Sequence, residues 1–244
     1  MKNYKITIQY DGTKYNGWQR QGNTKNTIQE KFENVLERMC QHPIEICASG
    51  RTDGGVHAKG QVANFKCDVG LSSNEIMEYL NRYLPEDVLV TDVEEADEHF
   101  HSRLNAVSKT YEYSIAVKKS DVFVRKYVYT VDEEIDVEKM RHASKLFLGT
   151  HDFMGFSSVG KSKKSTVRTI NSIDISENNG LIKIKINGSG FLYNMVRIIC
   201  GTLYEIGIGK LSVDVIDDVF NSKDRKMAGV TLPACGLALE KVFY

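Results

Sequence analysis

The sequence has little proline, no cysteine pairing pattern and no net charge. Only 3 of its 244 residues are proline, so long disordered linkers are not expected. Lys and Arg together number 32, as do Asp and Glu, which makes the formal net charge zero. This balance argues against a histone-like or polybasic polyanion binder, although phosphates respond to local charge rather than to the total.

The cysteines and the apolar runs exclude further classes of protein. Five cysteines, without a C-x-x-C pair, predict reduced and mostly buried thiols in a cytoplasmic protein, not a disulfide framework or zinc knuckle. The most apolar stretch, residues 191–208, is interrupted by Asn194, Arg197 and Glu205 and so predicts no transmembrane span. We also expect no signal peptide, because the first residues contain no apolar segment of that kind.

The first half of the chain alternates between strand and helix patterns. Two capping boxes, Thr27-x-x-Glu30 and Ser72-x-x-Glu75, precede apolar residues at helical spacing and predict two helices. Apolar residues with period two predict strands in four segments, at 4–10, 44–48, 63–67 and 88–90. The resulting order, β-α-β-β-α-β, is that of ferredoxin-like folds.

The second half repeats this pattern at larger size. Helix patterns cover 136–147 and begin again near 191 and 212. Strand patterns cover four segments, at 111–117, 173–175, 182–186 and 237–243. We therefore predict an α/β (α+β) fold of two ferredoxin-like halves, with domains at 1–103 and 104–244.

A glycine-rich loop, GRTDGGVH at 50–57, is the strongest local signal for chemistry. Glycine lets the backbone approach a ligand closely, and Arg51 and Asp53 would lie at the rim of a sheet. The alternative is an ordinary loop salt bridge or Asx-turn. Asp53 and His57 have the spacing of two metal ligands on a helix, but Gly54 and Gly55 disfavour a helix there.

Two other kinds of site, a second metal site and a P-loop, have less support in the sequence. His99 and His101 could ligate a metal from a strand, but without a third ligand at close spacing a polar surface pair is the better interpretation. The sequence also contains no G-x-x-x-x-G-K-[ST] motif, which excludes a P-loop.

These motifs in order resemble the tRNA pseudouridine synthase A family over essentially the whole chain. The resemblance rests on eight segments: YDGT (10–13), GWQ (17–19), GRTDGGVH (50–57), FHSR (100–103), SKTY (108–111), FLGTHDF (147–153), FLYNMVR (191–197) and PACGL (233–237). Small departures, such as Gly54 where the family commonly has alanine, put the substrate range in question rather than the chemistry.

The resemblance implies a pseudouridine synthase fold with a central cleft and a reaction without cofactor or metal. A uridine at position 38, 39 or 40 of the tRNA anticodon stem-loop is detached at its N1–C1′ bond, rotated and rejoined through C5. By motif position Asp53 is the catalytic aspartate, which either attacks C1′ or removes the 2′ proton. Family members are homodimers whose tRNA contacts both subunits, and no membrane is involved.

The resemblance also assigns roles to basic and aromatic residues. Tyr111 matches the tyrosine that stacks on the target base, although its period-two pattern alone would make it a core residue. Arg197 matches the arginine that meets the catalytic aspartate; read alone, it would be a snorkelling side chain. Arg51 is expected to face RNA or to stabilise the loop, and Arg103 and Lys109 to contact the substrate.

Charge is unevenly distributed along the chain. Residues 86–98 carry seven acids and no base, whereas 101–119 and 157–170 are basic, the latter through Lys161, Lys163, Lys164 and Arg168. The basic stretches predict a surface that follows phosphates, although solvated loops are the commoner explanation of lysine runs. Two other functions stay open: a catalytically silent RNA-binding protein, and an aspartate-dependent nucleoside glycosidase, which would normally need a second acid.

Overall fold

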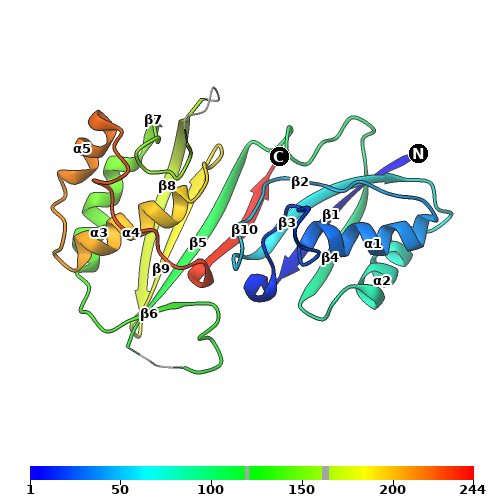
Figure 1. Cartoon of the computed structure of the whole chain (residues 1–244), viewed down its shortest axis with the longest axis horizontal. Helices are drawn as coiled ribbons and strands as arrows, with labels where there is room; N and C mark the ends of the chain where they lie inside the picture. Colours follow the sequence, from blue (N-terminus) through cyan, green and yellow to red (C-terminus); the bar gives the residue numbers. More distant parts are fainter. Residues whose placement is uncertain (119–120, 161–164) are drawn as a thin grey trace. The chain divides into compact units, whose positions relative to one another are not determined.

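The described residues form two compact α/β units. The computed structural model describes residues 1–118, 121–160 and 165–244. The first unit consists of Met1–Val107 with Ala238–Tyr244, and the second of Ser108–Leu237. Both combine strands and helices, which confirms the prediction of a mixed α/β fold (Figure 1).

The first unit follows the predicted β-α-β-β-α-β order along the chain, and its strands lie in the order β4-β1-β3-β2. Strand β1 lies antiparallel between β4 and β3, and β2 pairs antiparallel with β3. Its elements are β1 (Lys2–Tyr10), a short 3₁₀ turn η1 (Gly12–Lys14), α1 (Ile28–Cys40), β2 (Cys47–Ala48), β3 (His57–Cys67), α2 (Ser73–Tyr83) and β4 (Val88–Ala96).

Alternation along β1 builds the core of this unit. One face of the strand is almost fully buried, through Tyr4, Ile6, Ile8 and Tyr10. Helices α1 and α2 contribute buried side chains from one face each, namely Phe32, Leu36, Ile76 and Leu80. Burial of such side chains is the main favourable contribution to folding, at about 1.5–3 kcal/mol each.

The helix starts follow the capping signals in the sequence. The Ser72 side chain accepts a hydrogen bond from the Glu75 N–H, and the Glu75 carboxylate accepts one from the Ser72 N–H, so α2 has a complete capping box. In α1 the Thr27 side chain accepts from the Glu30 N–H. The Glu30 carboxylate lies 3.3 Å from Nε of Arg20, so this acid pairs with a neighbouring loop.

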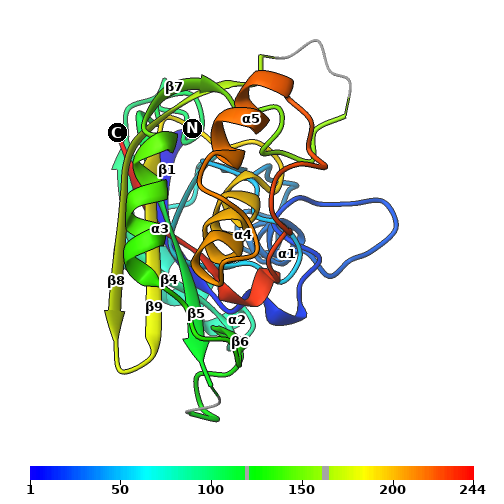
Figure 2. The same cartoon turned by 90° about the vertical axis from the view of Figure 1, so that its left-hand side faces the viewer.

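The second unit is a mainly antiparallel sheet with strand order β5-β9-β8-β7, to which β6 adds in parallel along β5. Helices α3 and α4 pack against each other beside this sheet (Figure 2). The elements are β5 (Ser108–Val117), β6 (Tyr129–Val131), α3 (Val137–Ser144), the 3₁₀ turn η2 (Lys145–Phe147), β7 (Gly149–Asp152), β8 (Val167–Asn178), β9 (Leu181–Gly188), α4 (Met195–Gly207), α5 (Val215–Ser222) and the 3₁₀ turn η3 (Ala234–Gly236).

The last strand, β10 (Leu237–Phe243), comes from the far end of the chain. Its residues Ala238 and Leu239 pair in parallel with His57 and Ala58 at the start of β3. The Val107 N–H also donates to the Phe243 carbonyl, 2.8 Å apart. Period-two alternation identifies a strand but not its neighbour, so the sequence could not assign this partner.

None of the helices in residues 1–118, 121–160 and 165–244 is long and apolar enough to cross a membrane.

An aromatic cluster forms part of the core of the second unit. Phe147, Phe153 and Phe156 are fully buried, and each lies within 6.0 Å, centroid to centroid, of the Phe220 ring on α5. The rings meet mainly edge to face, the arrangement that the aromatic quadrupole favours. The cluster therefore anchors α5 to the segment that follows α3.

Replacing Phe156 by Ala should lower the free energy of unfolding by about 3–5 kcal/mol, because a large cavity remains. Phe123, which is 85% exposed, is the matched control, and Phe123→Ala should change stability by no more than about 0.5 kcal/mol. Urea unfolding followed by circular dichroism measures both. Equal midpoints for the two variants would contradict the role of the aromatic cluster.

An ion pair at the end of β7 makes stability depend on pH. The Lys223 ammonium, 2.7 Å from Asp152, and then the Thr166 hydroxyl lower the pKa of the Asp152 carboxyl below its usual value. A carboxyl whose pKa is lower folded than unfolded stabilises the fold above its unfolded pKa, about 3.9, and loses this contribution as the pH falls through the folded value. Asp152→Asn should therefore reduce stability at pH 7 and leave it unchanged at the acid end. A pH series of urea midpoints tests this, and an equal loss at every pH would refute it.

Candidate active site

The loop that carries Asp53 connects β2 to β3 and is tied to the start of β3. The Ser49 hydroxyl donates to Gln61 Oε1 over 2.7 Å, and Gln61 Nε2 donates to the Gly50 carbonyl over 2.9 Å. Gln61 is fully buried, so its amide stabilises the base of the loop without contact with water.

A second loop, residues 11–18, holds the loop backbone on both sides of Asp53. The Trp18 N–H donates to the Thr52 carbonyl over 3.0 Å, and the Gly55 N–H donates to the Tyr15 carbonyl over 3.2 Å. The Val56 N–H closes a turn on the Asp53 carbonyl. These bonds leave the backbone at Asp53 little freedom, and its side chain lies half-buried.

A buried hydroxyl pair supports the same position. The Tyr10 hydroxyl lies 2.8 Å from Oγ1 of Thr52, the residue before Asp53. Burial raises the pKa of Tyr10 to about 12, while its hydrogen bond to Thr52 opposes this shift. Tyr10 therefore stays neutral at physiological pH and remains able to donate a hydrogen bond.

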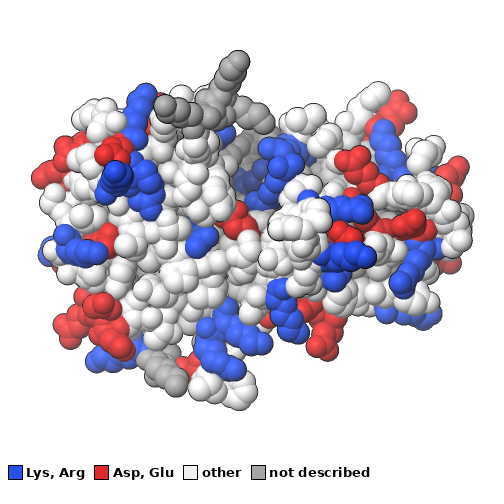
Figure 3. All heavy atoms as spheres, in the orientation of Figure 1, with Lys and Arg blue, Asp and Glu red and all other residues white. Residues whose placement is uncertain are grey.

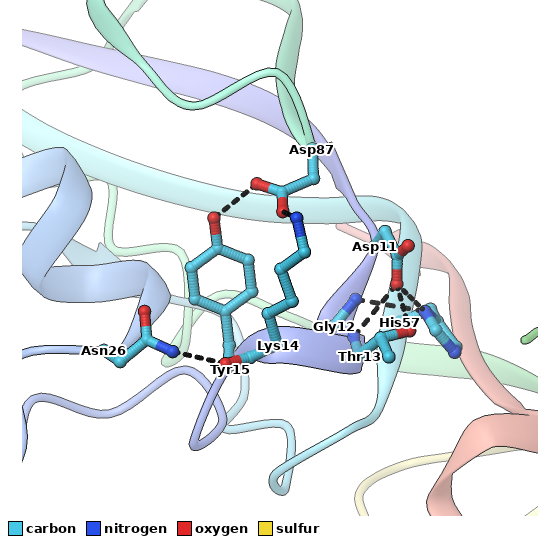
Figure 4. Close-up of polar contacts among 8 residues, drawn as sticks. All are labelled: Asp11, Gly12, Thr13, Lys14, Tyr15, Asn26, His57 and Asp87. Atoms are coloured by element: carbon cyan, nitrogen blue, oxygen red, sulfur yellow. Dashed lines mark hydrogen bonds and ion pairs between the residues drawn. The ribbon is translucent and has the colours of Figure 1, made fainter.

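Loop 11–18 is itself anchored to the neighbouring strands, as Figure 4 shows. Oδ1 of Asp11 accepts hydrogen bonds from the N–H and hydroxyl of Thr13 and lies 3.2 Å from Nδ1 of His57. The Gly12 N–H donates to the same His57 nitrogen over 3.0 Å. The Tyr15 hydroxyl donates to the Asp87 carboxylate, so the loop is held at β3 and just before β4.

The close approach of the two loops requires glycine at position 17. Gly17 has φ of +90°, and a Cβ there would lie 2.6 Å from the Thr52 carbonyl oxygen. Any larger residue would be strained in backbone conformation and would push the loop away from Asp53.

The second unit supplies the other residues that the sequence singled out. Tyr111 and Lys109 lie two residues apart on β5 and therefore point to the same side of the sheet. Tyr111 is 7% exposed, and its ring meets the Phe191 ring edge to face, with centroids 5.2 Å apart. Lys109 is half-buried.

Arg197 lies half-buried in the first turn of α4. Its Nε donates to the Leu232 carbonyl over 2.6 Å, and its Nη1 donates to Oδ1 of Asn194 over 2.9 Å. The Tyr113 hydroxyl donates to the carbonyl of Pro233, the residue after Leu232, over 2.7 Å, so the segment that binds Arg197 lies beside the face of β5 that carries Tyr111 and Tyr113. Tyr111 and Arg197 therefore belong to one side of the second unit.

Other predicted residues occupy exposed positions. Arg51 and Arg103 are both exposed in the first unit, and the Arg103 N–H donates to Nδ1 of His101. Lys161, Lys163 and Lys164 of the basic stretch lie outside the described residues, as does Lys119. Within the described ranges, no group of three or more His, Cys, Asp or Glu side chains could hold a metal ion.

Two acids of the acidic segment, residues 86–98, pair with lysines of the neighbouring strand. Lys2 pairs with Glu95 and Lys5 with Glu94, at 2.7 and 2.6 Å, across β1 and β4. Figure 3 shows acidic and basic side chains interspersed over most of the visible face, with a group of basic side chains beside the β5–β6 connection at the lower edge.

Sequence reasoning gave no role to the residues whose hydrogen bonds support the candidate site. Tyr10 and Asn194 were named only within longer segments, and Gln61 and Leu232 not at all. Bonds such as Tyr10–Thr52 and Leu232–Arg197 join residues far apart in the sequence, so local patterns do not reveal them. Asn194 alone carried a usable signal. It lies inside a predicted helix, where Asn is less favourable than at a turn, and the observed helix begins one residue later.

Comparison with known proteins agrees with the resemblance that the sequence motifs indicate. A family model described as tRNA pseudouridine synthase matches residues 6–105 and 143–244. A protein named tRNA pseudouridine synthase A from Bacillus sp. (strain KSM-64) is 49% identical over 100% of both chains. One named tRNA pseudouridine synthase A 2 from Clostridium perfringens is 46% identical, also over 100% of both. A solved Cbf5-Nop10-Gar1 complex reaches only TM-score 0.37 at 10% identity, over 82% of this chain and 44% of that one, too low to bear on the fold.

The contact between the two loops predicts a large effect of a small substitution. Gly17→Ala should lower the free energy of unfolding by about 1–3 kcal/mol, because the added Cβ meets backbone at a strained φ. Gly22→Ala is the control, since a Cβ at Gly22 meets nothing within 4 Å. Hydrogen exchange should also show faster exchange of the Trp18 amide in Gly17→Ala alone. If both variants behave like the unmodified protein, the loops are not in the described contact.

Proposed function

This chain belongs to the tRNA pseudouridine synthase family, and we propose that it isomerises uridine to pseudouridine at positions 38, 39 and 40 of the tRNA anticodon stem-loop. The observation that carries the proposal is the similarity to named tRNA pseudouridine synthases over 100% of the chain, at up to 49% identity. The matched segments include both the Asp53 loop and the α4 region.

We assign the chemistry to Asp53. The loop geometry supports this role, because backbone hydrogen bonds hold the residues on either side of Asp53 while its side chain stays half-buried. A carboxylate held in this way can attack C1′ of the target nucleotide or remove its 2′ proton, with no cofactor or metal in either route. In both routes the glycosidic N1–C1′ bond breaks and a C5–C1′ bond forms.

We propose that Arg197 pairs with the ionised Asp53 carboxylate and that Tyr111 stacks on the target base. One Asp–Arg contact at about 4 Å is worth on the order of 4 kcal/mol at an effective dielectric near 20. The guanidinium fork would also fix the carboxylate orientation. A base taken out of the RNA stack needs an aromatic platform, and Tyr111 offers a ring already oriented by Phe191.

The remaining assignments concern RNA binding and assembly. Arg51 and Arg103 are exposed and Lys109 half-buried, which suits contacts to phosphates that orient the substrate. The protein would act as a homodimer in the cytoplasm, where each tRNA contacts both subunits. These assignments rest on the family resemblance together with the positions of the three side chains.

The decisive experiment uses unmodified anticodon-arm RNA without added metal, followed by mapping of pseudouridine. The unmodified protein should form pseudouridine at positions 38–40, and Asp53→Asn should reduce the rate by about 100-fold or more, the scale that a reacting carboxylate supplies. Asp92→Asn, at an exposed position on β4, is the matched control and should retain full activity.

Three other outcomes of this experiment would contradict the proposal in different ways. Activity in both Asp53→Asn and the unmodified protein would remove Asp53 from the mechanism. RNA binding without product in either would favour a catalytically silent RNA-binding protein. Release of free uracil would favour a nucleoside glycosidase.

A further inference from the structure

The turn that leads into α4 contains a residue in an unusual conformation. Asn194 immediately precedes the helix and has φ of 60° and ψ of 4°, the left-handed region. Asn tolerates this region better than most residues because its short side chain can bond locally. The Asn194 side chain makes no capping hydrogen bond to the helix backbone, so ordinary helix capping does not explain it.

The Asn194 side chain instead links two other side chains. Its Oδ1 accepts a hydrogen bond from Nη1 of Arg197 over 2.9 Å. Its Nδ2 donates to Oγ of Ser158 over 3.1 Å. Ser158 is itself held, because its N–H donates to the Tyr193 carbonyl over 2.9 Å. Both ends of the amide are therefore engaged, and the oxygen is directed at Arg197.

Arg197 is held from a second direction by the segment before η3. Its Nε donates to the Leu232 carbonyl over 2.6 Å, and the Leu232 N–H donates back to the Arg197 carbonyl over 3.3 Å. The two bonds to the guanidinium use different nitrogens, Nε and Nη1. Because a guanidinium is planar, two such contacts fix the plane of the group as well as its position.

The segment that carries Leu232 is itself bound to α4 by hydrogen bonds. The Gly229 N–H donates to Oγ1 of Thr202 over 3.0 Å, and the Val230 N–H donates to the Glu205 carboxylate over 3.1 Å. A Cβ on Gly201 would lie 1.8 Å from the Val230 carbonyl oxygen, so the segment lies directly on the helix backbone. The Leu232 carbonyl is thus held against α4, and the Asn194 amide is a second contact at a different guanidinium nitrogen.

We propose that Asn194 is a positioning residue that orients the Arg197 guanidinium for its carboxylate partner. This inference rests on the proposed function, in which Arg197 supports the ionised Asp53. Bidentate recognition of a carboxylate depends on the orientation of the guanidinium plane, so a correctly placed but rotated Arg197 would be a poor partner. The left-handed conformation at Asn194 is then the consequence of directing Oδ1 at the first turn of its own helix.

The test replaces Asn194 by Gly, which keeps the left-handed backbone and removes only the side chain. Single-turnover pseudouridine formation should slow by about 10- to 100-fold, the scale of a small misplacement of a catalytic group. The KM for tRNA should stay within about twofold, since substrate binding is not affected. Asn179→Gly is the matched control, because Asn179 also has a left-handed φ, 50°, but lies exposed beyond β8. It should retain full activity.

A double-mutant cycle separates positioning from a general structural effect. If Asn194 acts through Arg197, Asn194→Gly should cause no further loss in an Arg197→Ala background. Additive losses would overturn the proposal, as would an unchanged rate in Asn194→Gly. A raised KM with an unchanged single-turnover rate would also overturn it and would place Asn194 in substrate binding.

A measurement without substrate keeps this inference distinct from the proposed function. The Nε–Hε signal of Arg197 in nitrogen-15 NMR should be sharp in the unmodified protein and in Asn179→Gly, and broadened or lost in Asn194→Gly. An unmodified protein that forms no pseudouridine on any tRNA would refute the proposed function. An Arg197 signal that does not change in Asn194→Gly would refute the positioning role, whatever the activity.

Discussion

Direct backbone contact between loop 11–18 and the Asp53 loop is the constraint on which the candidate site depends. The Trp18 N–H donates to the Thr52 carbonyl and the Gly55 N–H donates to the Tyr15 carbonyl. The two loops lie so close there that a side chain at position 17 is excluded. Three further contacts in the first unit support these loops: the Gln61 amide, the Tyr10 hydroxyl and the Asp11–His57 pair. A carboxylate on such a loop has its position set before a substrate arrives, which lowers the cost of orienting the reacting groups.

The second unit uses a comparable arrangement around Arg197. Long charged side chains lose considerable rotamer freedom when they are fixed, so an arginine rarely keeps one orientation without several partners. Here the Leu232 carbonyl and the Asn194 amide act on different guanidinium nitrogens, and both partners are themselves hydrogen-bonded. The two units therefore position their functional side chains differently. Backbone contacts between loops hold Asp53, whereas side-chain and carbonyl contacts hold Arg197.

Part of the acidic charge on this protein is paired locally. Glu94 and Glu95 of β4 pair with Lys5 and Lys2 of β1 across the sheet, which offsets part of the negative charge of residues 86–98. The buried Glu112 lies within 3.5 Å of Lys183 and Lys185 in the same way.

The sequence alone determined the mixed α/β class, the β-α-β-β-α-β order of the first half, the capping box of α2 and the glycine-rich loop around Asp53. These features depend on periodicity and on bonds between residues a few positions apart. Only the tertiary structure decided the pairing of β10 with β3 and the contacts that Arg197 and Asn194 make with Leu232 and Ser158. The Arg197–Leu232 and Asn194–Ser158 bonds join residues 35 and 36 positions apart, so they form only when separate segments pack together. Local patterns in the sequence carry no information about such contacts.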